Sequence, residues 1–483
     1  MRSNFRASQG NGQVGATGGK LWQLRILAGG VASAVVAAPA LAHTSGRGLI
    51  MLLPTNYYVF GGASAVLASI LLMALLPGRA IGGAGREWPL GAVPRWLGIV
   101  PSLASFAFIV MLIAAGFLGP FDPIANPLPG FIWTLWWVGF TCLCMILGNL
   151  WPVLNPWTGV TRLVAGVRGA ERPLLRYPAW LGYWPAIVMF LGFAWLELVD
   201  PAPEDPPHLA MAVATYLVLN FAGALLFGER DWLGKAEAFS AYFRLIGRLS
   251  PLQWRGDQAT LKLCIGLPGY GLLETGATGI SAAAFVLLTL ATVSFDGLSR
   301  TFFWAGLLGL NPLEFPGRSA VVFANTAGLS LMFAGLASAY ALAILVSRFA
   351  GVAGRLPSLV LSIVPIAIAY HIAHYLPDFP VAAMRALKAL SDPFGSGRDF
   401  LGMGSLAPPA SQMMDYRVAE LVYRLQTAFI VVGHVAAVAI AHLRTIAAGV
   451  NRRDTLLIQA PLNVLMVLYT VFGLWLLSTP VIS

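Results

Sequence analysis

The sequence predicts an all-α protein, a polytopic bundle of about ten transmembrane helices that follows an N-terminal signal sequence. Hydrophobic residues make up 58% of the 483 residues and charged residues only 10%, against about 25% in an average soluble domain. A soluble chain of this length needs charged side chains to cover its surface. Lipid must therefore cover much of the surface of this protein.

The formal net charge of +10 raises the question of a nucleic-acid partner. The Lys and Arg residues, however, lie in short segments between apolar stretches, which is how a membrane protein sets its orientation. A nucleic-acid-binding face would gather them in one patch or stripe. We therefore expect membrane lipid, and no nucleic acid, to be a partner.

Residues 1–42 have the pattern of a basic tail followed by a signal sequence. An apolar run at 26–36 ends in a series of small residues, and Ala40 and Ala42 form a small-x-small cleavage signal. Cleavage after Ala42 would make His43 the first residue, whose amine and imidazole together can bind a metal ion such as copper. The alternative is that His43 follows the cleavage site by chance.

Residues 43–483 form a single transmembrane helical domain without an internal repeat. A spanning helix needs about 20 mostly apolar residues. The two longest polar linkers are 229–278, in which 238–248 predicts an amphipathic helix on the membrane surface, and 377–424, in which 381–390 predicts a short capping helix. The segments that are long and apolar enough to span the membrane are 57–77, 97–118, 131–150, 178–197, 208–228, 279–297, 321–346, 356–376, 425–443 and 459–478.

The distribution of positive charge predicts the orientation. One set of linkers, which includes 229–278, carries 18 Lys and Arg residues, whereas the segments on the other side, which include 377–424, carry 8. Because cytoplasmic loops are enriched in Lys and Arg, we expect 229–278 to be cytoplasmic and 377–424 periplasmic. The chain is then a multi-pass protein of the bacterial inner membrane with both mature termini in the periplasm.

Histidines inside the predicted spans are candidates for a functional site, because ionisable groups are costly in the bilayer. His371 and His374 stand at i and i+3 and share one helix face. From helix rise, His371 lies about 8 Å and His434 about 13 Å below the periplasmic ends of two consecutive antiparallel helices. Three imidazoles at these depths predict a site for a divalent metal ion, zinc or copper.

Two carboxylates lie at compatible depth. Asp296 ends the sixth predicted helix and Glu197 ends the fourth, both on the predicted periplasmic side. Either could be a metal ligand, could orient an imidazole, or could act as a general base. Two alternatives stay open: each histidine merely hydrogen-bonds within the bundle, or the two helices hold a haem b between them.

Several stretches resemble bacterial integral membrane proteins known as fenitrothion hydrolases. The resemblance covers nearly the whole mature chain and implies hydrolysis of an organophosphorus triester at its aryl ester bond. It implies no particular catalytic residues. The stretches that carry it are 42–48, 53–55, 291–297, 369–375, 391–395, 433–442 and 469–478.

Three functions follow from these observations. The first is a membrane-embedded metal-dependent hydrolase, in which a divalent ion lowers the pKa of its bound water to about 7 and a small lipophilic ester enters from the bilayer. The second is a copper-binding or transport protein, for which His43 would be a ligand. The third is a haem b electron-transfer protein.

Overall fold

The computed structural model describes residues 55–75, 86–94, 98–168, 173–256, 260–273, 278–311, 314–349, 358–409 and 415–481. The predicted signal sequence at 1–42, its cleavage site and His43 lie outside the described residues.

The predicted helical membrane bundle is confirmed. Within the described ranges, eight helices are long and apolar enough to cross a membrane, and a pair bent by 74° adds a ninth. The bent pair is η11–α15 (Leu359–Tyr375) followed by α16 (Phe379–Ser391). The eight are α2 (Thr55–Leu75), α3 (Ile99–Leu118), the continuous α4–η3–α5 helix (Pro127–Leu147), α9 (Pro206–Phe227), α12 (Ile280–Ser299), η8–α14 (Arg318–Ser347), α17 (Tyr416–Ala447) and α18 (Arg452–Ser478).

The segment predicted at 178–197 forms a shorter helix than expected. Its main part is α8 (Trp184–Leu198), which has 15 residues and is therefore about 22 Å long. That length is less than the hydrocarbon core of about 30 Å. It is preceded by the single 3₁₀ turn η4 (Ala179–Leu181).

The prediction that the helix at 238–248 lies on the membrane surface is wrong. The helix exists as α11 (Ala238–Gly247), but it packs against α5 (Thr141–Leu147) and α8 inside the bundle, and Phe243 is 0% exposed. A mixed apolar and basic composition does not distinguish the two cases, because Arg244 finds a protein partner in the carbonyl of Gly234. Shorter elements in the linkers are α6 (Trp151–Leu154), α7 (Pro156–Arg168), α10 (Glu229–Asp231), η5 (Trp232–Ala236), η6 (Tyr270–Leu272) and α13 (Phe302–Leu307).

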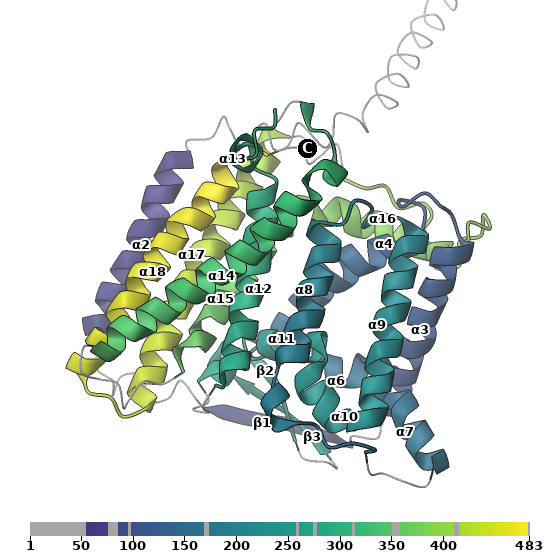
Figure 1. Ribbon diagram of the computed structural model, residues 1–483, viewed down its shortest axis with the longest axis horizontal. Helices are drawn as coiled ribbons and strands as arrows, with labels where there is room; N and C mark the ends of the chain where they lie inside the picture. The colour runs from purple at the N-terminus through teal and green to yellow at the C-terminus, as the bar shows by residue number, and fades with distance from the viewer. Residues whose placement is uncertain are drawn as a thin grey trace, which may run out of the picture.

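A small antiparallel sheet, which the sequence did not predict, joins two linkers. Its strand order is β1 (Glu87–Pro94), β3 (Thr260–Gly266), β2 (Leu252–Gly256). Strand β1 belongs to the linker 78–96, which is in the same Lys- and Arg-rich set of linkers as 229–278, and the sheet places these two linkers together at one end of the bundle. The C-terminus and α16 lie at the opposite end (Figure 1).

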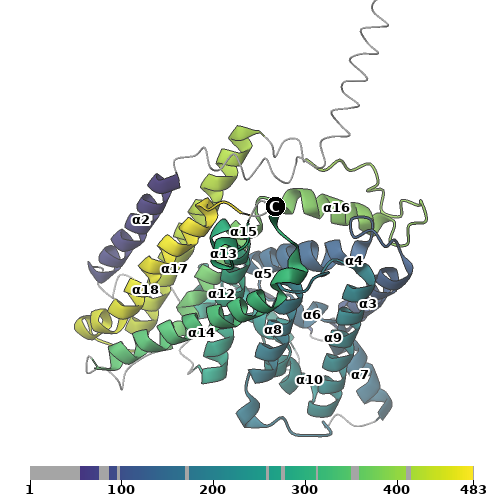
Figure 2. The ribbon, with the colours of Figure 1, turned by 45° about the horizontal axis from the view of Figure 1, so that its top comes forward.

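The helices form two neighbouring groups. On one side α2, α17 and α18 pack together, and on the other α3 packs against α7 and α9, with α8 and α12 between the groups (Figure 1). The helix α15 packs against α12 and α17, so it lies in the centre of the bundle. Figure 2 shows α16 lying across the ends of the upright helices, where it contacts η3 (Gly130–Phe140).

Gly433 sets the close approach of α17 to α15, and its substitution by alanine is expected to destabilise the protein. A Cβ atom at Gly433 would clash with the Cβ of Ala369 and would lie 2.8 Å from the carbonyl oxygen of Pro365. Overpacking of this kind costs about 1–3 kcal/mol. Thermal unfolding in detergent would measure the loss, with Gly335→Ala as the control because a Cβ there meets nothing within 4 Å. Equal melting temperatures for the two variants would contradict the prediction.

Candidate functional site

At the centre of the site, a histidine of one helix forms a hydrogen bond with a carboxylate of another helix. The Nε2 atom of His374, in the last turn of α15, lies 2.8 Å from Oδ2 of Asp296, near the end of α12. Arg300, the C-cap residue of α12, stands four residues after Asp296 and places Nη2 3.1 Å from the other oxygen, Oδ1. The Asp296 side chain is only 2% exposed, so these two cationic or polar partners compensate the charge of the buried carboxylate.

Tyr375 connects this pair to the second predicted carboxylate. Its hydroxyl lies 2.6 Å from Oε1 of Glu197 and 3.0 Å from Oδ2 of Asp296. The indole N–H of Trp137, in the π-helix η3, donates to the same hydroxyl oxygen at 3.1 Å. Because a phenol has a single proton, it can donate to only one of the two carboxylates at a time. Four protonatable groups therefore form one continuous chain: Glu197, Tyr375, Asp296 and His374.

The helix ends bring these groups together. Helix α15 ends at Tyr375, and α16 begins after Pro377 and Asp378, so the chain turns by 74° immediately past the two functional residues. At the end of α8, Arg318 donates to the backbone carbonyl of Glu197 at 2.8 Å and so fixes the end of that helix. A cation is favourable at this position, because the carbonyl groups of a helix C-terminus carry partial negative charge.

A small cleft opens beside His374. It has a volume of about 70 Å³ and is lined by His374, Arg300 and Gln426 together with apolar residues of the C-terminal segment. The amide of Gln426 donates to the carbonyl of Ala373 at 2.7 Å, and its Oε1 atom has no hydrogen-bond partner in the described part of the chain. Since a water molecule occupies about 30 Å³ in the liquid, the cleft has room for about two of them between polar groups.

The structure brings together His374, Asp296 and, through Tyr375, Glu197, but it does not bring His434 to them. His371 is buried and packs edge-on against the rings of Trp137 and Tyr375. His434 lies elsewhere, with Nδ1 2.8 Å from the Ile430 carbonyl oxygen and its ring near Tyr469 of α18. The Nε2 atoms of His371 and His434 both lack a hydrogen-bond partner among the described residues.

The reason for this separation is the register of α15 against α17. Helix α17 begins at Tyr416, whereas the sequence predicted its start near residue 425. Gln426 of α17 lies at the end of α15, where its amide donates to the carbonyl of Ala373. Gly433 contacts Pro365 and Ala369, so His434 stands level with residues deeper than His371 and His374.

In the ranges that the structure describes, no group of three or more His, Cys, Asp or Glu side chains is placed to hold a metal ion. The divalent metal predicted from His371, His374 and His434 therefore has no such group of ligands among the described residues, and it stays a prediction. His43 is outside the described residues. The other described histidines pair locally: His208 with Asp200 at 3.0 Å, and His442 with Gln459 at 3.5 Å.

Three residues of the site were not identified from the sequence. Arg300 had a visible signal, since it stands at i+4 from Asp296 on one helix face. Tyr375 follows His374 directly, but nothing in its neighbourhood indicates that it touches two carboxylates from other helices. Trp137 carried no signal, because the π-helical turns of η3 (Gly130–Phe140) change which side chains share a face.

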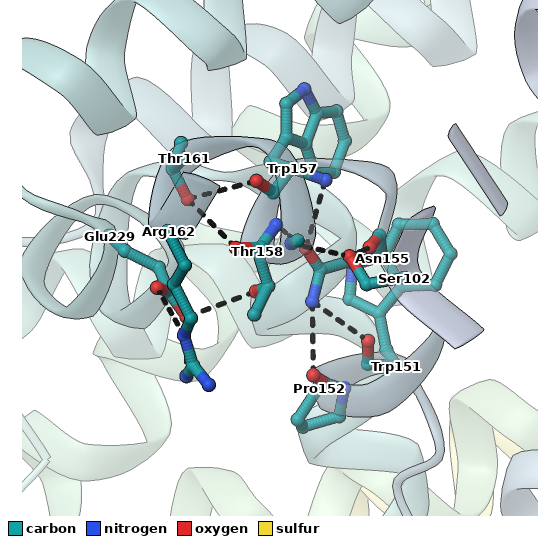
Figure 3. Close-up of polar contacts among 10 residues, drawn as sticks. Ser102, Trp151, Pro152, Asn155, Trp157, Thr158, Thr161, Arg162 and Glu229 are labelled. Atoms are coloured by element: carbon teal, nitrogen blue, oxygen red, sulfur yellow. Dashed lines mark hydrogen bonds and ion pairs between the residues drawn. The ribbon is translucent and has the colours of Figure 1, made fainter. Parts of the chain in front are cut away.

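A second polar cluster lies at the other end of the bundle and has a structural role. Asn155 caps the start of α7: its Oδ1 accepts from the backbone N–H of Thr158 at 2.9 Å, and its backbone carbonyl accepts from Ser102 of α3 at 2.6 Å (Figure 3). Glu229 receives the Arg162 side chain through two bonds of 3.1 Å. These bonds tie α3, α7 and α10 together.

Comparisons of the chain with protein-family models, with curated proteins and with solved structures gave no match. The resemblance to fenitrothion hydrolases is therefore untested and stays a prediction. Any functional assignment has to come from the site itself.

Proposed function

We propose that the protein is a membrane-embedded hydrolase of a lipophilic ester, in which an organophosphorus triester is a candidate substrate. The observation that carries this proposal is the bond of 2.8 Å between His374 and Asp296 beside a small cleft that His374 lines. A histidine oriented by a carboxylate is an arrangement that enzymes use for general-base catalysis. The apolar side chains of Leu476 and Leu477 on the cleft wall suit a lipophilic substrate.

Each residue has a role in this proposal. When Nε2 of His374 donates to Asp296, the other ring nitrogen, Nδ1, is the basic one, and it removes a proton from a water molecule in the cleft. Asp296 stabilises the imidazolium that forms. Arg300, whose side chain is 37% exposed and lines the same cleft, stabilises the negative charge that develops on the carbonyl or phosphoryl oxygen of the ester.

The test is a direct assay of the full chain in lipid nanodiscs. A nitrophenyl phosphotriester and a nitrophenyl carboxylic ester serve as substrates, and the release of nitrophenol is followed by absorbance. The proposal expects release above the rate of empty nanodiscs with at least one of the two. If neither ester is cleaved, with and without added zinc or copper, the proposal is wrong.

The predicted metal dependence is tested on the same preparation. If a divalent ion bound by His371, His374 or His434 supplies the nucleophile, chelation is expected to abolish nitrophenol release and zinc or copper to restore it. If His374 acts as a general base alone, chelation leaves the rate unchanged. Metal content by mass spectrometry and an absorption spectrum would also test the copper and haem alternatives.

A second candidate function is proton-coupled transport, which the chain of four protonatable groups favours. Chains of Asp, Glu and His inside a membrane are typical of proton relays. Tyr375→Phe separates the two candidates, because it removes the hydroxyl that bonds both Glu197 and Asp296 and leaves the pair of His374 and Asp296 in place. A hydrolase is expected to keep most of its activity in this variant. Proton flux into pH-dye-loaded liposomes that is lost with Tyr375→Phe would favour the relay.

A further inference from the structure

A large apolar cavity lies apart from the cleft, among α3, η3, α8 and α9, the helices on one side of the bundle (Figure 1). Its volume is about 560 Å³, which is in the range of ligand-binding sites, about 300–1,000 Å³. No charged side chain and no histidine is among its described lining residues. It shares no lining residue with the cleft beside His374.

Most of the polar side chains that line the cavity are already hydrogen-bonded to the protein. Five tryptophans line the cavity, and four of them donate their indole N–H to a protein acceptor, so that what these four present to the cavity is carbon. The hydroxyl of Tyr216 donates to Glu237 in the same way. The four bonds are Trp133 to the Pro203 carbonyl, Trp151 to Glu237, Trp157 to the Leu217 carbonyl and Trp195 to Thr326.

The cavity is long and parallel to the helices. Along α9 its lining extends from Leu209 to Leu219, which is about 15 Å from the rise per residue. That is about half of the hydrocarbon core of a bilayer, and it is the direction in which lipid chains lie. From volume, shape and lining we infer that this cavity binds one hydrocarbon tail, either of a bilayer lipid or of a lipophilic solute.

The cavity lies next to the candidate site. Binding of a tail in the cavity does not depend on the proposed hydrolysis. Trp136 of η3 lines the cavity, and the next residue, Trp137, donates to Tyr375. Leu196 of α8 also lines it, and the next residue is Glu197. A tail in the cavity therefore lies against the two helices that position the chain of protonatable groups.

The test uses the full chain in nanodiscs and two photoreactive probes. One is a free 16-carbon fatty acid with a diazirine midway along its chain, and the other is a phosphatidylcholine that carries the same acyl chain. After irradiation, mass spectrometry of the digested protein locates the label. We expect it on residues that line the cavity, such as Phe193 and Val213. Label from the fatty acid alone indicates a free solute, and label from both probes indicates a lipid.

Gly192→Leu is the decisive variant. Gly192 lines the cavity and a Cβ there meets nothing within 4 Å, so leucine fills part of the space without a clash. The label in the cavity is expected to fall about tenfold, which corresponds to about 1.4 kcal/mol of binding free energy. Ala212→Phe, on α9, provides an independent second variant.

Gly335→Leu is the matched control, because Gly335 is also helical, a Cβ there meets nothing within 4 Å, and it does not line the cavity. This variant is expected to keep the full cavity label. The inference is overturned if the cavity residues carry no more label than the exposed face of α14, or if Gly192→Leu and Ala212→Phe both retain it. Because no step requires ester cleavage, failure of the hydrolase proposal leaves this result unaffected.

Discussion

Replacing His374 by alanine is expected to lower kcat/KM for nitrophenyl ester cleavage by about 10²–10⁴-fold, the range for loss of a positioned general base. His374 is the only described histidine that both contacts a buried carboxylate and lines the cleft. Asp296→Asn is expected to cause a loss in the same range, because the amide no longer stabilises the imidazolium. It also leaves Arg300 without its anionic partner.

The control for this prediction is His208→Ala. His208 also contacts a carboxylate, Asp200, at 3.0 Å, but its side chain is 47% exposed and it does not line the cleft. Its removal is expected to leave the rate unchanged. If His374→Ala and His208→Ala cleave the ester equally fast, His374 is not the base, and the proposed site is wrong even if the protein is a hydrolase.

The sequence predicted most of the fold, because the length of an apolar segment alone indicates a spanning helix. What it could not predict were features that depend on how helices meet. The residues 238–248 have the same composition whether the helix lies on a membrane or inside the protein. The π-helical form of 130–140 also leaves no mark in hydrophobic periodicity.

The sequence predicted only part of the site, because the contacts between its residues also depend on how the helices meet. Asp296, Glu197 and His374 were identified because ionisable residues at the ends of apolar helices are unusual. The partner of each, however, depends on the axial register of separate helices. The contacts of Gln426 with Ala373 and of Gly433 with Ala369 set this register, which places Gln426 at the cleft and His434 below it. The sequence around Tyr375 does not distinguish it from other aromatic residues, because its two carboxylate partners lie on other helices, α8 and α12.

Replacing Glu237 by alanine is expected to cause the largest loss of stability among single substitutions in the described part of the chain. The side chain is 0% exposed and is the N-cap of the buried helix α11. It accepts from the backbone N–H groups of Phe239 at 2.9 Å and Ser240 at 2.6 Å, from the indole of Trp151 at 3.1 Å, and from the hydroxyl of Tyr216. Each buried donor left without an acceptor costs about 1–3 kcal/mol.

Four such donors in one place give an expected loss of at least about 3 kcal/mol, measured by denaturant unfolding in detergent. Glu237→Gln is expected to lose less, because its carbonyl oxygen can still cap α11. Glu229→Ala is the matched control: Glu229 is 27% exposed and pairs with Arg162, and partly exposed ion pairs contribute about 0–1 kcal/mol. Similar losses for Glu237→Ala and Glu229→Ala would show that water satisfies the four donors, and that α11 is less tightly enclosed than its burial indicates.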